Sequence, residues 1–273
     1  MNRIFFLGDI HGDWRPIRNL DSRLEDKLDL HDTIVLLGDA GLNFYFNHRD
    51  ENLKKKLSKM NCRFFIIRGN HEQRPSICAA EKENSTFVSD RWEYNYFIVN
   101  GIEGMMWKEN KYPNIFYAED QPSTYSFVDH ETLVIPGAYS VDKYHRLANG
   151  WSWFEGEQLT EEEMELGRFI VRHQKKFDLI LSHTCPTMFE PTDLFLSCID
   201  QSQVDKTMER YLSEIEFNAQ YKVWLWGHYH AHREYPMEIG KPTYENPRRI
   251  MLFNEKAVEL SDLFNEEYMV TTY

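Results

Sequence analysis

The sequence predicts a layered α/β domain. Several short apolar runs are nearly continuous rather than alternating with polar residues, which is typical of strands buried on both faces. Segments with the periodicity of amphipathic helices lie between these runs. Because the two kinds of segment alternate along the 273 residues, we expect helices packed in layers against a sheet.

The predicted strands are the apolar runs at residues 4–7, 33–37, 63–67, 132–135, 179–181 and 222–226. The predicted helices are residues 15–28, 51–60, 160–174 and 203–217. Thr160 followed by Glu163 resembles a capping box, in which side chain and backbone bond reciprocally at a helix start. This pair therefore marks the beginning of the third predicted helix.

Three further segments depart from this alternation. Between Phe87 and Phe127, short aromatic segments are broken by glycine and proline, which predicts antiparallel strands in a second sheet. Residues 139–157 are rich in Trp, Tyr and Gly and predict a long loop, of the kind that often serves function in compact domains. Residues 249–260 predict a final strand pair. Because no linker or internal repeat is visible, residues 1–273 are interpreted as a single domain, with a peripheral tail after about residue 260.

Composition limits the class of protein. A hydrophobic content of 42% supports a real core. The apolar run Ile4–Leu7 follows the first residues so closely that no signal peptide is expected, and no run approaches the length of a membrane span. The cysteines form no C-x-x-C pair, which favours a reduced, cytoplasmic protein. They are Cys62, Cys78, Cys185 and Cys198.

The charge of the chain disfavours polyanionic partners. A formal net charge of -13 repels nucleic acid, so general nucleic-acid binding is not expected. The main basic cluster, Lys54, Lys55 and Lys56, lies in the predicted helix 51–60 and is interpreted as a solvated helix face. The sequence leaves the oligomeric state open.

Polar side chains follow five of the predicted strands. Because the carboxyl ends of strands in open α/β sheets border the ligand crevice, we expect these side chains to meet at one edge of the sheet. The segments are Gly8-Asp9-Ile10-His11-Gly12, Gly38-Asp39, Arg68-Gly69-Asn70-His71-Glu72, Ser182-His183 and Gly227-His228-Tyr229-His230.

These residue types suit a metal site. Carboxylate oxygen and imidazole nitrogen together favour divalent Mn, Fe, Zn or Ni, and the absence of thiolates argues against a purely structural zinc site. In Asp9-x-His11 and His228-x-His230, the spacing puts both side chains on the same side of an extended chain. Each motif alone also fits an ordinary turn, loop or hydrogen-bonded histidine. Their ordered recurrence at strand ends predicts a metal site.

The whole series, from Asp9 to His230, resembles the signature of the calcineurin-like metallophosphoesterase superfamily, and Gly-His-x-His fits its bacterial and phage members best. The resemblance implies a four-layer αββα fold, with two central mixed sheets and a site for two divalent ions at the strand carboxyl ends. Manganese is the favoured ion. By motif, the first metal is held by Asp9, His11 and His230, the second by Asn70, His183 and His228, and Asp39 bridges them.

The resemblance also implies a mechanism. Two adjacent cations clamp the phosphoryl oxygens and lower the pKa of a bridging water, so that hydroxide attacks phosphorus in line. His71 is the candidate catalytic residue, as a general acid or as a hydrogen-bond donor to the leaving oxygen. Its structural alternative is a loop histidine that stabilises the site entrance. Glu72 is interpreted as a supporting residue.

One departure separates this chain from a branch that it partly resembles. In serine/threonine protein phosphatases and the related diadenosine tetraphosphate hydrolases, Gly-Asp is followed by x-x-Asp-Arg-Gly, whose arginine grips phosphate. Here Leu42 and Asn43 stand where that aspartate and arginine would be, which argues against a protein phosphatase.

Substrate contacts are predicted in the segment after Gly137, which resembles loops of small bacterial members. We expect His145 or Arg146 to contact phosphate and Trp151 or Trp153 to stack on a base or wall the pocket. Asn43 is a further candidate. The structural alternative is an Asp142–Arg146 ion pair with the tryptophans packed as core.

The predicted function is therefore dinuclear-metal-dependent hydrolysis of a phosphate ester, carried by a small molecule, a nucleotide or a phosphoprotein. One alternative is a nucleotide-directed phosphodiesterase or dinucleoside polyphosphate hydrolase. Another is a metal-binding interaction scaffold without catalysis. Retention of every expected ligand and of His71 speaks against the scaffold.

Overall fold

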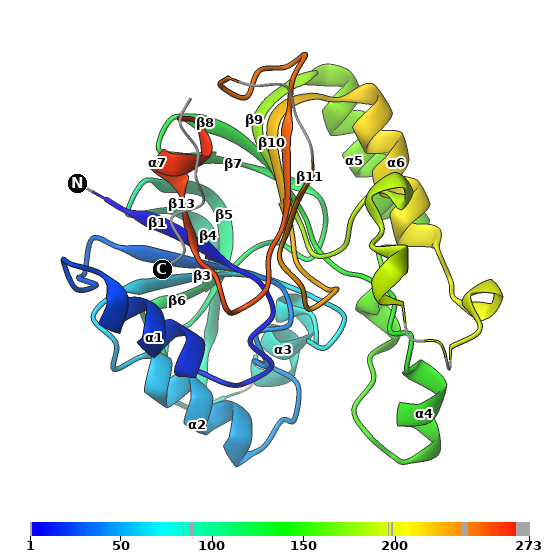
Figure 1. Cartoon of the computed structure of the whole chain (residues 1–273). Coiled ribbons are helices and arrows are strands. Elements are labelled where there is room, and N and C mark those ends of the chain that lie inside the picture. The colour runs from blue at the N-terminus through cyan, green and yellow to red at the C-terminus, as the bar shows by residue number, and fades with distance from the viewer. Residues whose placement is uncertain are drawn as a thin grey trace.

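The computed structural model describes residues 2–83, 85–87, 90–195, 197, 199–235 and 240–265 (Figure 1). Its strands are β1 (Ile4–Leu7), β2 (Thr33–Leu37), β3 (Arg63–Ile67), β4 (Trp92–Val99), β5 (Ile102–Glu109), β6 (Ile115–Tyr117), β7 (Ser123–Phe127), β8 (His130–Ile135), β9 (Lys176–Ser182), β10 (Gln220–Trp226), β11 (Arg233–Tyr235), β12 (Arg248–Met251) and β13 (Val258–Glu259). Its α-helices are α1 (Arg15–Arg23), α2 (His48–Leu57), α3 (Pro75–Lys82), α4 (Lys143–Ala148), α5 (Glu161–His173), α6 (Thr207–Asn218) and α7 (Leu260–Leu263). Short 3-10 helices are η2 (Glu155–Glu157), η3 (Thr187–Phe189), η4 (Thr192–Leu194) and η5 (Gln201–Gln203).

Hydrogen bonds link the strands into one curled sheet of 13 strands. The order is β11-β12-β10-β9-β8-β7-β5-β6-β3-β2-β1-β13, and β4 pairs with β5. Pairing is parallel from β12 to β8 and from β6 to β1, whereas β7 and β5 between them are antiparallel to their neighbours. The sheet thus has an N-terminal flank (β1, β2, β3, β6) and a C-terminal flank (β8, β9, β10, β12).

The antiparallel strands expected between Phe87 and Phe127 join these flanks. β6 pairs with β3, with Phe64 opposite Ile115, and β7 pairs with β8, with Ser123 opposite Val134. The mixed α/β fold is confirmed. The described strands form one continuous hydrogen-bonded ladder, so strand pairing does not divide them into the two predicted sheets. The four-layer arrangement stays a prediction.

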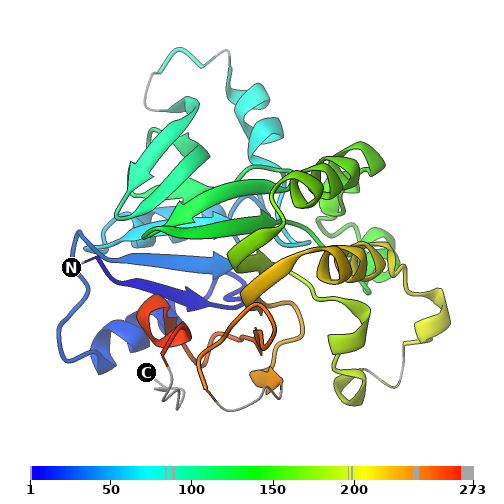
Figure 2. The same ribbon diagram turned by 90° about the horizontal axis from the view of Figure 1, so that it is seen from above.

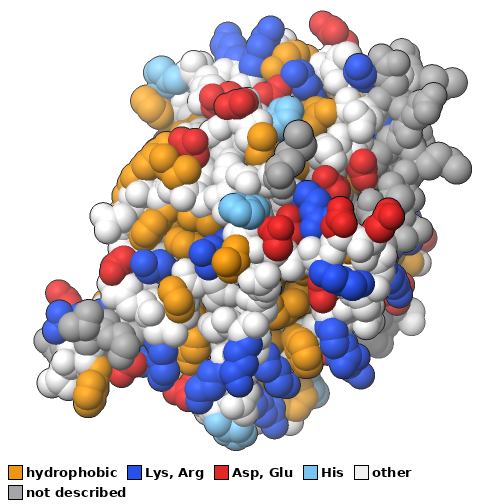
Figure 3. Space-filling model, turned by 90° about the vertical axis from the view of Figure 1, so that its left-hand side faces the viewer, with side chains coloured by type: hydrophobic (Ala, Val, Ile, Leu, Met, Phe, Trp, Pro, Cys, Tyr) orange, Lys and Arg blue, Asp and Glu red, His pale blue; other side chains and the backbone are white. Residues whose placement is uncertain are grey.

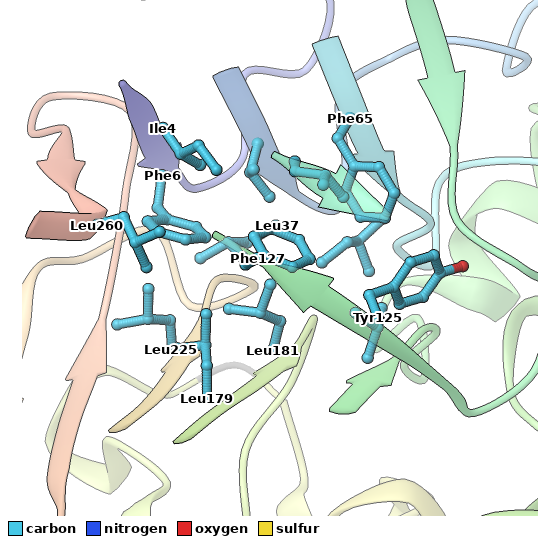
Figure 4. Close-up of a cluster of buried hydrophobic side chains, with 14 of the residues drawn as sticks. Ile4, Phe6, Leu37, Phe65, Tyr125, Phe127, Leu179, Leu181, Leu225 and Leu260 are labelled. Atoms are coloured by element: carbon cyan, nitrogen blue, oxygen red, sulfur yellow. The ribbon is translucent and has the colours of Figure 1, made fainter. Parts of the chain in front are cut away.

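The apolar core lies in three places, because successive side chains of a strand point to opposite faces. An inner cluster, which includes Phe6, Phe65, Phe127, Leu181 and Leu225, brings side chains of both flanks together (Figure 4). These side chains are almost fully buried, so the two flanks share one apolar interface.

Two outer clusters cover the other faces of the flanks. Phe5 and Ile34 pack with Ile17 of α1 and Leu53 of α2 on the N-terminal flank. The corresponding cluster on the C-terminal flank contains Ile180 and Trp224 with Met164 of α5 and Leu212 of α6. Seen from above, α1 and α6 consequently lie on opposite sides of the strands (Figure 2).

The helix starts and ends follow local hydrogen bonding. The predicted capping box at α5 is confirmed, since Thr160 Oγ1 accepts from Glu163 N and Glu163 Oε2 accepts from Thr160 N. Helix α1 ends at Arg23, before the predicted residue 28, because Leu24 turns to extended backbone. Helix α6 begins at Thr207 rather than residue 203, where the carboxylate of Asp205 accepts from Thr207 N.

Three of the described α-helices lie outside the predicted ones: α3, α4 and, at the end of the described chain, α7. Helix α3 begins at Pro75, and α4 lies inside the segment 139–157 that the sequence predicts as a loop. Helices α3 and α4 are short, of 8 and 6 residues, which leaves little periodicity to detect.

Residues 249–260 contain the two predicted strands, but these do not pair with each other. β12 pairs with β10 and β11, whereas β13 pairs with β1 at the other end of the sheet. Leu260 and Leu263 of α7 then pack into the inner cluster. The rest of the predicted tail, from residue 266, lies outside the described residues.

The interpretation of the basic cluster in α2 needs one correction. Lys55 and Lys56 are exposed, but Lys54 is buried, donates to Glu109 Oε2 and lies beside the rings of Trp92 and Tyr112. Its long side chain reaches inward and pairs with a buried carboxylate. On the face seen in Figure 3, Lys and Arg side chains gather along the lower edge, and acidic side chains lie among them.

Cys62, Cys78 and Cys185 are buried free thiols, and Cys198 lies outside the described residues. Within the described part of the chain, none of the helices combines the length and apolar composition that crossing a bilayer requires.

Candidate metal centre

Four predicted ligands have a left-handed backbone at or just after strand ends. They are His11, Asp39, His228 and His230, with φ of 45°, 47°, 72° and 52°. Non-glycine residues rarely adopt this conformation, and such strain gathers at functional sites. The sharp turn redirects each side chain as the chain leaves the sheet.

Three glycines make room for ligand side chains. A Cβ on Gly38 would lie 2.0 Å from His183 Nδ1, and one on Gly69 would lie 2.1 Å from Asp39 Oδ1. A Cβ on Gly227 would lie 2.3 Å from Asp9 Oδ1. Since real Cβ atoms do not approach so closely, any other residue at these positions would displace a predicted ligand.

The first group of predicted ligands comprises Asp9, His11 and His230, whose ligand atoms lie within 4.8 Å of one another. His11 Nε2 and His230 Nε2 are 2.7 Å apart, and Asp9 Oδ2 lies 3.3 Å from His230 Nε2. Asp9 Oδ1 accepts from His228 N, whereas its buried Oδ2 has no hydrogen-bond partner. An unpartnered buried carboxylate oxygen facing imidazole nitrogens suits a cation.

The second group surrounds Asp39. Asp9, Asp39 and His183 also have ligand atoms within 4.8 Å, and Asn70 Oδ1 lies 3.0 Å from His183 Nε2. His228 is next to them, with ring centroids of His183 and His228 5.0 Å apart. Asp39 therefore lies close to both His11 and His183.

The tautomer of His183 also fits a metal ligand. Its Nδ1 is 2.7 Å from the Leu37 carbonyl oxygen and can only donate to it, so Nε2, which faces Asp39 and Asn70, is the nitrogen that would give up its proton to bind a cation. Metal-binding histidines are usually oriented in this way by a hydrogen bond from the other ring nitrogen. The residues present thus fit divalent cations.

The charge balance points the same way. Burial disfavours protonation of His183, but Asp39 and Asp9 outweigh it and raise the pKa of His183 to about 9. Although burial opposes it, His71 and His183 hold the pKa of the Asp39 carboxyl well below its usual range. The site is an enclosed region of negative charge that a divalent cation would neutralise.

Glu72 connects the segments that follow two strands, β2 and β3. Its buried carboxylate accepts from the backbone nitrogens of Asp39 (3.1 Å), Gly41 (2.8 Å) and Gly69 (2.8 Å). Burial, and then the charge of Asp39, raise the pKa of Glu72 to about 8. Its contacts are to backbone only, so it orients the turns after β2 and β3, in agreement with a supporting role.

Asn70 is oriented from the segment after β8. Its Nδ2 donates to Ser140 Oγ at 2.9 Å, which turns Oδ1 towards His183. Ser140 N donates to Glu157 Oε1, and the buried guanidinium of Arg68 donates to the Glu157 carbonyl oxygen at 2.8 Å. This network joins the end of β3 to both ends of the segment 139–157.

His71 forms a close pair with Arg146. Arg146 NH2 donates to His71 Nε2 at 2.6 Å, and His71 Nδ1 lies 3.6 Å from Asp39 Oδ2. Arg146 is buried and its Nε donates to Asp142. Burial, with a smaller contribution from Arg146, lowers the pKa of His71 to about 4 against the opposing effect of Asp39. The predicted Asp142–Arg146 pair and the predicted place of Arg146 at the site thus coexist.

Trp151 lines a pocket with His11 and His71, whereas three other predicted substrate residues have their contacts away from the metal ligands. The buried side chain of Asn43 accepts from Lys54 Nζ at 2.7 Å, away from the metal ligands. His145 is exposed and contacts Trp151, with ring centroids 5.2 Å apart. Trp153 lies under Lys143, whose Nζ is 4.2 Å from the ring centroid.

Sequence reasoning missed several residues that support or line the site. Ser140, Glu157 and Arg68 are part of the network around Asn70, and Asn254 Nδ2 donates to the Asp9 carbonyl oxygen at 2.7 Å. Phe44 stacks on His71, with ring centroids 5.6 Å apart. Of these residues, only Arg68 could have been singled out from the sequence, because it directly precedes Gly69-Asn70-His71.

A cluster of Asp, His and Asn at the ends of parallel strands defines a metal-dependent hydrolase. The sequence profile of the calcineurin-like phosphoesterases matches residues 2–232, and the chain belongs to this family. It is thus a metal-dependent phosphoesterase, and the predicted family and enzyme class are confirmed. No curated protein matches the sequence at a significant level.

Solved structures show distant similarity. Phosphopantetheinyl hydrolase from Mycobacterium tuberculosis is 10% identical, with a TM-score of 0.46, and the match covers 92% of this chain and 89% of that one. A protein of unknown function from Aquifex aeolicus is 15% identical, with a TM-score of 0.31, and the match covers 66% of this chain and 77% of that one. A serine/threonine phosphatase from Saccharomyces cerevisiae is 14% identical, with a TM-score of 0.30, and the match covers 92% of this chain and 66% of that one. All three TM-scores are below 0.5, so the assignment rests on the family match.

Proposed function

We propose that the chain hydrolyses phosphate esters with two divalent metal ions bound at the strand ends. Asp9, His11 and His230 would hold one ion, Asn70, His183 and His228 the other, and Asp39 both. The observation that carries this proposal is the position of the Asp39 carboxylate between His11, His71 and His183. When bound, the two ions supply Lewis acidity, which activates water at neutral pH and neutralises the phosphoryl oxygens.

The remaining chemistry falls to His71 and Arg146. Their hydrogen bond, 2.6 Å between Arg146 NH2 and His71 Nε2, places two nitrogen groups beside Asp39. We propose that Arg146 turns from His71 to a phosphoryl oxygen when substrate binds, and that His71 then hydrogen-bonds the leaving oxygen. Arg146 would thereby replace the phosphate-gripping arginine whose usual position Asn43 occupies.

Several finer predictions are part of the same proposal. We propose that residues 1–273 form one domain, that its two flanks and outer helices correspond to the four αββα layers, and that the enzyme acts in the cytoplasm. Manganese is the proposed native ion, since oxygen and nitrogen ligands without thiolate suit it. A nucleotide-directed activity remains the alternative.

The test is turnover of p-nitrophenyl phosphate and bis-p-nitrophenyl phosphate after EDTA treatment and again after Mn²⁺ addition. Turnover is expected to vanish with EDTA and return with Mn²⁺, with metal analysis giving about two ions per chain. Parallel additions of Zn²⁺, Ni²⁺ and Fe²⁺ show which ion restores the highest turnover.

A second readout does not need activity. Binding to the folded state alone raises the thermal midpoint, so Mn²⁺ at about a hundred times its dissociation constant should add about 2.7 kcal/mol to stability. Stoichiometric Mn²⁺ binding without turnover of either compound would contradict the proposal and favour the scaffold.

A further inference from the structure

Two separate pockets flank the predicted metal ligands. The first has a volume of about 660 Å³ and is lined by His11 and His71 together with parts of residues 41–49 and 146–152. The second has a volume of about 450 Å³ and is lined by His228 and His230 together with parts of residues 139–141 and 194–209. Both volumes fall in the range of pockets that bind small ligands.

The first pocket is aromatic and cationic. Phe44, Tyr45 and Trp151 line it together with Arg49 and Arg146, and its lining contains no Asp or Glu. The guanidinium of Arg49 lies 4.8 Å from the ring centroid of Tyr45. In a chain of net charge -13, such a lining selects an aromatic or anionic group.

The second pocket is apolar. Its lining includes Tyr139, Val141, Phe195, Val204 and Tyr229, and the rings of Phe195 and Tyr229 stack with centroids 6.4 Å apart. Such a surface favours an aliphatic group.

The charged side chains in its lining are engaged with the protein. Lys206 pairs with Glu190, and Asp205 accepts from Thr207 N and from Gln158 Nε2. Glu209 Oε1 accepts from Thr184 Oγ1 at 2.8 Å. The other carboxylate oxygen of Glu209, Oε2, is buried and has no hydrogen-bond partner. Lys206 and Asp205 are therefore partnered within the protein, and Glu209, 3% exposed, offers little surface to the pocket.

The two pockets are lined by neighbouring predicted ligands. His11 lines the first and His230 the second, and their Nε2 atoms are 2.7 Å apart. A phosphorus atom held beside these nitrogens would therefore lie next to both pockets. A phosphomonoester has one organic substituent and would fill one pocket only, whereas a phosphodiester has two.

We propose that the substrate is a phosphodiester with unequal arms, an aromatic or polar arm in the first pocket and an aliphatic arm in the second. This inference rests on the proposed hydrolysis and names its substrate class. Water adds to phosphorus, and the bond from phosphorus to the oxygen of the first arm breaks. That oxygen takes a proton and leaves as an alcohol or phenol, while the aliphatic arm stays on the phosphomonoester product. His71 and Arg146 line the first pocket, which makes it the leaving-group side.

The experiment keeps the leaving group constant and varies the other arm. p-Nitrophenyl phosphate, methyl p-nitrophenyl phosphate and hexyl p-nitrophenyl phosphate are compared on the Mn²⁺-loaded full chain. The hexyl diester is expected to have the highest kcat/KM, at least about tenfold above the methyl diester, as burial of about two methylene groups would give. A hexyl-to-methyl ratio near one, or the highest kcat/KM for the monoester, would overturn the proposal.

Two matched variants locate the effect. Val141→Asp puts a charge into the lining of the second pocket, so the hexyl-to-methyl ratio should fall towards one. Val128→Asp is the control, because Val128 is equally exposed (43%, as for Val141) and belongs to the β7–β8 turn. A ratio that falls equally in both variants, or in neither, contradicts the assignment of the second pocket.

Product binding separates this inference from the hydrolysis on which it rests. Calorimetric titration of Mn²⁺-loaded protein should show hexyl phosphate binding at least about tenfold tighter than methyl phosphate. If none of the three compounds is hydrolysed but hexyl phosphate keeps this advantage, the proposed hydrolysis fails and the apolar pocket stands. Equal binding of the two products overturns the pocket whether or not turnover occurs.

Discussion

The candidate metal centre and the segment 139–157 contact each other but are built differently. Asp9, Asp39 and His183 are almost completely buried at strand ends, in turns that glycines make possible. The segment 139–157 is a connection with one short helix, and its Trp151 is 58% exposed. Polar contacts such as Asn70–Ser140 and Arg68–Glu157 tie it to the sheet. The sheet therefore fixes the positions of the predicted ligands. The segment 139–157, held by these polar contacts, instead lines part of the pocket beside them.

The largest effect is expected where the sheet itself is altered. Asp39→Asn removes one negative charge from between the two predicted ions, so both should bind weakly and kcat should fall at least about a thousandfold, equivalent to several kcal/mol. Metal analysis and turnover measure this. Asp129→Asn is the control, since Asp129 also has a left-handed backbone (φ of 65°) but is exposed in the β7–β8 turn. Normal metal content in the Asp39 variant would refute the bridging role.

The next effect concerns the buried Lys54–Glu109 pair, which lies away from the predicted ligands. Lys54→Met should cost about 3 kcal/mol, because Glu109 is then left buried without its partner. The double variant Lys54→Met with Glu109→Leu should recover most of this loss. Urea unfolding provides the measurement. Equal stability of the single variant and the wild type would mean that the pair contributes little.

A smaller effect distinguishes substrates. His71→Ala should lower kcat for alkyl phosphates about a hundredfold and for aryl phosphates much less, because a good leaving group needs no proton. Arg146→Ala should instead weaken both equally, since it contacts phosphate in either case. Steady-state kinetics with phenyl and propyl phosphates test this. Equal losses in the His71 variant would count against its role at the leaving oxygen.

The smallest effect tests the hydrogen bond that joins Asn70 to Ser140 in the segment 139–157. Ser140→Ala removes the acceptor for Asn70 Nδ2, so metal affinity should fall about tenfold while the fold is retained. Ser22→Ala on α1 is the matched control, because Ser22 Oγ also makes one hydrogen bond, to the Asn19 carbonyl oxygen. Unchanged Mn²⁺ affinity in the Ser140 variant would show that Asn70 is oriented by its other contacts.

Much of the fold could be predicted from the sequence, for a physical reason. Strands such as β1, β2 and β3 are buried on both faces, so their apolar runs match the observed bounds residue for residue. Helix ends were less predictable, because residues such as Leu24 leave the helix through local contacts that periodicity does not encode. The β12 and β13 strands joined opposite ends of the sheet, since pairing partners depend on the whole topology.

The candidate site divides in the same way. Sequence alone determined the family and the candidate ligands, because each ligand follows an apolar strand within a few residues and the ends of parallel strands meet at one edge. It could not determine that Lys54 is buried against Glu109, that Asn43 turns away to Lys54, or that Arg146 contacts His71 across 75 residues. Those contacts join segments far apart in the chain, and their geometry exists only once the two flanks have packed together. The two pockets are likewise a property of tertiary structure, because each is lined by residues from several separate segments.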